Sequence, residues 1–137
     1  MKTTISAVVL TVALTVARAY AGQMVVIGNG NVPKMDIVSV QKVYTGKIIT
    51  FAGVSITPIA LKPGMEERSR FLREFIKQDE DKYTAYWTVR RYIGKGVPPV
   101  ELPSTDDIVK YVASTPGAVG YIDESELKPG MNVIIRK

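Results

Sequence analysis

Apolar residues recur along the chain with two periods, one typical of strands and one typical of helices. Continuous or alternating apolar runs predict strands at 24–28, 48–51, 54–61, 118–122 and 131–135. Helical spacing predicts helices over 36–44, around 67–77, over 79–93 and from 104 to the stop at Pro116. The order strand, helix, two strands, two or three helices, strand, strand predicts one α/β sheet with helices packed on it, in a single domain.

The stretch from Val112 to Ile122 contains the sharpest boundary in this pattern. Pro116 cannot continue a helix, and Gly117 can take the positive φ that a helix exit often needs. The strand that follows alternates, so Gly120 and Tyr121 are expected on opposite faces of the sheet. Because Gly120 has no side chain, a helix or another backbone is expected to approach it closely.

Polar residues and glycine mark the predicted ends of the helices. Asp36, Asp79 and Ser104 precede apolar-periodic segments and predict N-caps, while Gly46 predicts a C-terminal cap. Pro58 removes a backbone donor from the strand that contains it, so this strand is expected to be an edge strand or to be kinked there.

Charged residues are expected on the surface, with one exception. Arg68 and Arg70 lie in the same predicted helix, where Arg70 falls on the polar side and Arg68 falls on the apolar arc in the first turn. Asp123, Glu124 and Glu126 lie in a predicted turn region, and this pattern is typical of solvated surface.

The first 21 residues have the pattern of a secretory signal peptide. Lys2 supplies a positive charge, residues 5–16 form an apolar run, and Ala19-Tyr20-Ala21 predicts cleavage after Ala21. The alternative is an uncleaved N-terminal anchor, although the run is shorter than the ~20 residues of a bilayer span. The mature chain is then residues 22–137, located in the periplasm or secreted.

Composition excludes several classes of function. The 137 residues include no cysteine and no histidine, which excludes disulfides, thiolate metal sites and a histidine general base. Removal of Lys2 and Arg18 with the predicted signal peptide lowers the formal net charge from +5 to +3, which is too small to indicate nucleic-acid binding. No nucleophile elbow, calcium loop or marked carboxylate pair is present, so we expect a protein that is not an enzyme and has neither metal nor cofactor. A hydrolase with a carboxylate base is the weaker alternative.

One segment has local features of an anion site. Residues 63–69 follow a predicted strand and enter a helix, where free N–H groups and the helix dipole attract an oxyanion. Arg68 could supply a bidentate partner and Ser69 a hydroxyl group. The alternative is a helix start satisfied by its own Glu66 and Glu67, with Arg68 paired to one of them.

Several segments, taken together and in order, resemble the phosphate-binding proteins of ABC transporters, and most closely their short single-lobe relatives. These segments are 29–33, 43–47 (Val-Tyr-Thr-Gly-Lys), 56–59, 64–71, Trp87 with the following 94–99, and 115–121 (Thr-Pro-Gly-Ala-Val-Gly-Tyr). The resemblance spans nearly all of residues 22–137. It implies one lobe of a type II periplasmic binding protein, with a mixed sheet of about five strands flanked by helices.

The resemblance also implies a ligand site and its partners. The anion-binding loop of the family, Gly-Ser-Gly-Thr, falls on Gly64, Met65, Glu66 and Glu67, of which only Gly64 is kept. Together with the local features of the helix start, this gives Gly64, Met65, Arg68 and Ser69 as the candidate ligand-binding residues, and the implied ligand is phosphate or a related oxyanion. An ABC permease, another envelope protein or a second copy of the chain is the implied partner.

Two functions follow from this resemblance. The first is a periplasmic solute-binding module for phosphate or a related oxyanion, linked to ABC transport. The second is an interaction module of the cell envelope that has lost phosphate binding. The first is the expected function, and the side chains at 65–67 with the absent second lobe motivate the second as the alternative.

Overall fold

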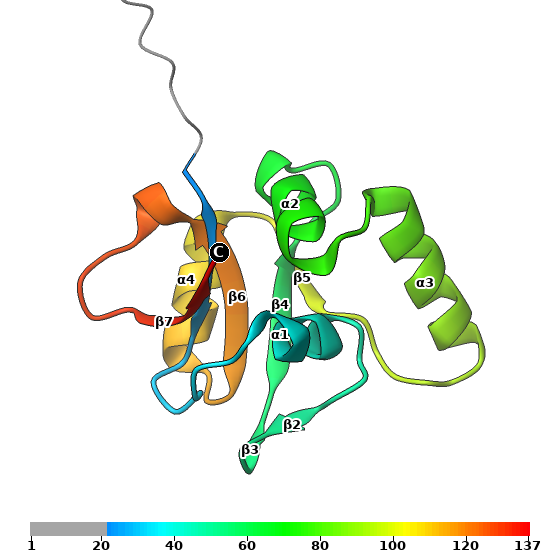
Figure 1. The fold of residues 1–137 in the computed structure, drawn as a ribbon, viewed down its shortest axis with the longest axis horizontal. Helices are drawn as coiled ribbons and strands as arrows, with labels where there is room; N and C mark the ends of the chain where they lie inside the picture. Colours follow the sequence, from blue (N-terminus) through cyan, green and yellow to red (C-terminus); the bar gives the residue numbers. More distant parts are fainter. Residues whose placement is uncertain (1–21) are drawn as a thin grey trace, which may run out of the picture.

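The computed structural model describes residues 22–137, and the predicted signal peptide, 1–21, lies outside them. Its main feature is a five-stranded mixed sheet in the order β5-β4-β6-β1-β7 (Figure 1). β4 runs parallel to β5 and β6, whereas β1 runs antiparallel to β6 and β7. The strands are β1 Met24–Gly28, β4 Thr57–Leu61, β5 Val100–Leu102, β6 Ala118–Asp123 and β7 Asn132–Arg136. This confirms the predicted α/β class.

Four α-helices and one small hairpin complete the described part of the chain. The helices are α1 Ile37–Tyr44, α2 Glu66–Phe71, α3 Glu80–Tyr92 and α4 Thr105–Ser114. A π-helical segment, Leu72–Ile76, continues α2, and a 3₁₀ turn, Glu124–Glu126, follows β6. The hairpin is β2 Thr50–Phe51 with β3 Val54–Ser55. Within residues 22–137, no helix has the length and apolar character needed to cross a bilayer.

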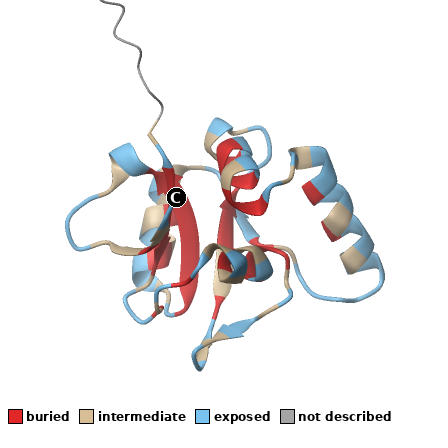
Figure 2. Ribbon diagram, in the orientation of Figure 1, coloured by how far each residue is buried: buried red, intermediate tan, exposed pale blue. Residues whose placement is uncertain are grey.

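β6 lies at the centre of the core, and its alternation places helices on both faces. A Cβ on Gly120 would lie 2.7 Å from Ile108 of α4, so this face of the strand lets α4 approach closely. On the other face, the Tyr121 ring stacks on Phe71 of α2 at 4.0 Å between centroids. Figure 2 shows buried residues along β1 and β6, with exposed residues on the outer sides of the helices. The predicted alternation of this strand is confirmed.

The predicted helix caps are confirmed. Asp36 and Asp79 each accept a hydrogen bond from the backbone N–H three residues later, at 2.8 Å. Ser104 accepts one from Asp107 at 3.1 Å. Gly46 follows the end of α1 with a φ of +70°, as expected of a residue that closes a helix.

Gly117 joins α4 to β6 at a crowded point. Its φ is +78°, its N–H donates to the Asn31 side chain at 2.8 Å, and its carbonyl accepts from Thr57 N at 2.9 Å. A Cβ at this position would lie 2.0 Å from the Ser55 carbonyl oxygen. A glycine is therefore required here because the Ser55 carbonyl approaches closely and because the φ is positive.

The expectation for Pro58 is corrected in part, because β4 is an interior strand of the sheet. Thr57 N–H points to β6, so the position of the missing N–H of Pro58 faces the other neighbour. On that side the pairing with β5 begins only at Ile59. The proline therefore lies where β4 has a local edge, and no ladder hydrogen bond is lost.

Two short elements differ from the predicted pattern. β5 was not predicted, because three residues beside a proline pair carry no periodicity. The expected strand at 48–51 is limited to Thr50–Phe51, and Ile49 is exposed. Ile93, the last residue of the helix predicted over 79–93, is also exposed.

Arg70 and Asp123 are buried, which corrects their predicted exposure. The Arg70 guanidinium donates to Asp123 Oδ2 at 2.7 Å and to the Gly22 carbonyl. Because the two side chains come from α2 and the end of β6, the pair ties this helix to the sheet and to the start of the described chain. Arg70 lies on the polar arc of a short helix, and it is buried where the backbone at Gly22 and the end of β6 meet it.

This pair predicts a dependence of stability on pH. Burial alone raises the pKa of Asp123, but hydrogen bonds from Ser125 and from Arg70 outweigh it and lower the pKa. The contribution is therefore complete above the pKa of an unfolded aspartate, about 4, and is lost as the pH falls below it. We expect Asp123→Asn to be about 2 kcal/mol less stable than the native chain at pH 7, with the gap closing toward pH 2.5.

The measurement is urea unfolding of both proteins at several pH values. Asp81→Asn, at an exposed position in the first turn of α3, is the matched control and should leave stability nearly unchanged at pH 7. A gap between native and Asp123→Asn proteins that stays constant down to pH 2.5 would contradict the assignment.

Candidate functional site

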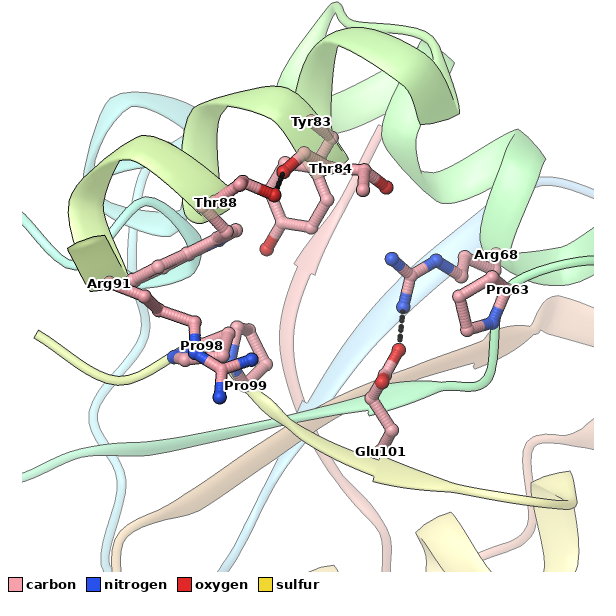
Figure 3. A pocket seen from close by; sticks show the side chains of 10 residues that line it. Pro63, Arg68, Tyr83, Thr84, Thr88, Arg91, Pro98, Pro99 and Glu101 are labelled. Atoms are coloured by element: carbon pink, nitrogen blue, oxygen red, sulfur yellow. Dashed lines mark hydrogen bonds and ion pairs between the residues drawn. The ribbon is translucent and has the colours of Figure 1, made fainter.

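A pocket of about 290 Å³ lies between the start of α2, the inner side of α3 and the loop that leads to β5 (Figure 3). Its walls combine two arginines, two threonines, two aromatic rings, three prolines and one glutamate. The volume is at the lower end for ligand pockets, which are commonly about 300–1,000 Å³. Of the four site residues predicted from the sequence, Arg68 lies in this pocket, and it is the one that carries a charge.

Arg68 is 5% exposed, and its guanidinium is held by three partners within the protein. Nε and Nη2 donate to the two carboxylate oxygens of Glu80, both at 2.8 Å. Nη1 donates to Glu101 at 2.6 Å and to the Leu61 carbonyl at 2.8 Å. These bonds use four of the five N–H donors of an arginine. Arg68 therefore links α2, α3, β4 and β5.

The charge balance around Arg68 is negative. Burial alone lowers the pKa of Arg68, but the hydrogen bonds and charge of Glu80, joined by Glu101, outweigh it and raise the pKa. The cation therefore stays charged, and it faces two carboxylates. Glu66 and Glu67 add two more negative charges in the first turn of α2. An incoming oxyanion at Arg68 would therefore meet two carboxylates already bound to the guanidinium, with one N–H donor of Arg68 left free.

The other three predicted residues lie outside the pocket. Gly64 is exposed, with a φ of +95°, and Met65 is the N-cap of α2 without a side-chain hydrogen bond. Ser69 is exposed and lines a separate hollow with Asp79 and Lys77. The structure thus places Arg68 in the pocket and Ser69 in a different hollow.

The carboxylate partners of Arg68 were not found from the sequence. The sequence indicated Glu66 or Glu67, neighbours in the same turn, whereas the partners are Glu80 and Glu101, 12 and 33 residues away. In the sequence, Glu80 was recognisable only as an acidic residue in the first turn of the helix predicted over 79–93. Glu101 lies in β5, a strand that the pattern did not indicate.

Arg91 is the second cation of the pocket and was also missed. It is exposed, and within residues 22–137 it forms no ion pair or side-chain hydrogen bond. Thr84 and Thr88 lie beside it on α3, one helical turn apart, and Thr88 Oγ1 donates to the Thr84 carbonyl at 2.9 Å. In the described part of the chain no cluster of three or more acidic side chains is arranged to hold a metal ion.

α3 forms the outer wall of the pocket and is fixed to the C-terminal end of α1. Four of its side chains donate hydrogen bonds to the carbonyls of Tyr44, Thr45 and Gly46, which have no partner within α1. The donors are Tyr83, Tyr86, Trp87 and Arg90. Burial raises the pKa of Tyr83 to about 12, so its hydroxyl remains a donor at neutral pH. The pocket wall is therefore rigidly placed.

Comparison with solved structures identifies the fold. The structure is similar to a phosphate ABC transporter substrate-binding protein with bound phosphate from Clostridium perfringens, with a TM-score of 0.63 and 18% identity. It is also similar to an ABC-type phosphate transport receptor from Vibrio cholerae (TM-score 0.56, 12% identity) and to PstS from Borrelia burgdorferi (TM-score 0.61, 13% identity). No family model and no curated protein matches the sequence.

The share of each chain that the matches cover tests the prediction of a single lobe. Each match covers 82% of this chain but only 44–46% of the neighbour. The chain therefore spans less than half the length of the solved structures that it matches. The fold is that of one lobe of a phosphate-type substrate-binding protein, as the resemblance implied. The three neighbours are transport binding proteins rather than enzymes.

Proposed function

We propose that the protein is a solute-binding-protein-like module of the cell envelope that acts by binding a partner, without capturing free phosphate in its single lobe. The observation that carries the proposal is the state of Arg68. Its guanidinium is already bound by Glu80, Glu101 and the Leu61 carbonyl.

Energetics favour this proposal over capture of an anion at α2. A buried oxyanion needs most of its lone pairs satisfied by donors, since each unsatisfied polar group costs about 1–3 kcal/mol. To reach Arg68, phosphate would have to displace a carboxylate at 2.6–2.8 Å and would remain close to it. Ser69, the expected hydroxyl donor, lines a different hollow.

The second candidate function is oxyanion binding linked to ABC transport. It is favoured by the phosphate bound to the Clostridium perfringens neighbour and by Arg91, a cation of the pocket without a carboxylate partner among residues 22–137. A second copy of the chain or a permease would have to supply the other half of the site. Both candidate functions place the protein in the periplasm or outside the cell, which is where the predicted signal peptide would direct it.

Isothermal titration of residues 22–137 with phosphate, sulfate and molybdate separates the two candidates. We expect no saturable heat up to about 5 mM ligand, because one free cation on an open surface gives too little binding free energy. Saturable binding that Arg91→Ala removes and Lys110→Ala leaves intact would establish the second candidate and overturn the first.

The first candidate also requires a positive result. Chemical cross-linking of the tagged protein in intact cells is expected to give a discrete adduct with an envelope component. Recovery of the free monomer alone, together with absent anion binding and absent binding to lipid vesicles, would contradict the proposal.

A further inference from the structure

The exposed apolar side chains of the molecule are concentrated at one end of α3. Of the seven large apolar residues that are strongly exposed in the described chain, four fall between 89 and 97. Tyr92 is 92% exposed and Val97 is 83% exposed, and Val89 and Ile93 are more than half exposed. The other three, Val38, Ile49 and Val100, are separated from these four in the sequence. Single exposed apolar residues are ordinary, but a cluster requires an explanation.

Cations accompany this cluster. Residues 82–100 contain four basic residues and no acidic residue. Arg90 is engaged by the Gly46 carbonyl and lies 5.4 Å from the Tyr86 ring. Arg91 and Lys95 are exposed, and within residues 22–137 neither forms an ion pair. We call Val89, Arg91, Tyr92, Ile93, Lys95 and Val97 together the α3 tip.

Glu101 lines the same pocket as Arg91, but its carboxylate is paired with Arg68 at 2.6 Å. The other acidic residues of this region lie at the far end of the helix. Asp79, Glu80 and Asp81 surround the N-terminus of α3, and Arg91 lies ten residues after Asp81. Ten residues of helix span about 15 Å, whereas charges in water are screened over about 8 Å at physiological ionic strength. The α3 tip therefore presents a positive field that the acidic end does not cancel. In Figure 1, α3 stands at the margin of the molecule, away from the central sheet.

We propose that the α3 tip docks on an anionic phospholipid surface. Tyrosine and aliphatic side chains enter the headgroup region, while arginine and lysine pair with lipid phosphates. Charge complementarity and size both favour lipid. A standard protein interface takes about 20–30 residues on each side, whereas the tip offers six. The inference rests on the proposed function and names the partner surface of the module.

Co-sedimentation with vesicles tests the proposal. Residues 22–137 are used because they form the predicted mature chain and contain the hydrophobic core that the structure describes. We expect binding to phosphatidylcholine vesicles that contain about one phosphatidylglycerol in three lipids, and little binding to phosphatidylcholine alone. Arg91→Gln combined with Lys95→Gln should weaken binding about 30-fold, because two cations near the surface are lost. Tyr92→Ser combined with Val97→Ser should weaken it at least about tenfold.

Matched control variants test whether the charge effect and the apolar effect are specific to the α3 tip. Lys110→Gln combined with Lys128→Gln removes two exposed cations elsewhere, and Ile49→Ser removes an exposed apolar side chain; both should bind like the native chain. Absence of binding to either vesicle, equal binding to both, or equal loss in the controls would overturn the proposal. A dimer or protein adduct that Tyr92→Ser abolishes, without vesicle binding, would overturn it while leaving the proposed function intact. If the protein binds neither lipid vesicles, nor a second copy of itself, nor another protein, both this proposal and the proposed function are overturned.

Discussion

Gly117→Ala is expected to lower the free energy of unfolding by about 4 kcal/mol. The residue has a φ of +78°, and its new Cβ would lie 2.0 Å from the Ser55 carbonyl oxygen. Its own N–H and carbonyl are bonded to Asn31 and Thr57, so the backbone cannot shift to relieve the clash without losing hydrogen bonds. Urea unfolding followed by the fluorescence of Trp87, the single tryptophan, measures the change.

Gly130→Ala is the matched control for the clash. Gly130 has a φ of +87°, but a Cβ there would meet nothing within 4 Å. This variant should lose only about 1 kcal/mol of stability, which is the cost of holding an alanine at a positive φ. If Gly117→Ala costs no more than Gly130→Ala, the close approach of the α4–β6 junction to Ser55 is not a determinant of the fold.

Arg68→Ala is expected to cost about 3 kcal/mol of stability. Breaking a buried ion pair commonly costs about 3–5 kcal/mol, and the lower end applies because the two carboxylate partners reach solvent. The variant removes hydrogen bonds that join α2 to α3 and to β5, and it leaves the Leu61 carbonyl without this donor. Thermal and urea unfolding of the variant measure the loss.

Two further variants define the role of Arg68. Lys62→Ala removes an exposed cation close to it in sequence and should change stability by less than about 0.5 kcal/mol. Glu101→Gln keeps an acceptor oxygen and should cost less than Arg68→Ala. Native stability in Arg68→Ala would show that the guanidinium is available for a ligand, contrary to the structural role assigned to it.

The sequence predicted the elements whose signals are local. The caps at Asp36, Asp79 and Ser104 depend on one side chain and an N–H three residues away, so spacing alone identified them. The stop at Pro116 and Gly117 was found for the same reason. The apolar alternation of β6 was long enough to place Tyr121 and Gly120 on opposite faces.

The elements that were missed depend on pairings distant in sequence. Periodicity placed Arg68 on the apolar arc, but it could not show that Glu80 and Glu101 neutralise it there. Arg70 was assigned to the surface because nothing local indicated that Asp123, 53 residues later, would meet it. β5 has three residues and is defined by its pairing with β4 rather than by its own pattern.

The central claim is that Arg68 is used by the fold and is not available for phosphate. The most direct test is the unfolding midpoint of residues 22–137 and of Arg68→Ala, each with and without about 10 mM phosphate at constant ionic strength. A ligand that binds the folded state raises the midpoint by mass action. We predict that Arg68→Ala lowers the midpoint by the same amount in both buffers and that phosphate raises neither. A phosphate-dependent rise in the native protein that disappears in Arg68→Ala would contradict the claim.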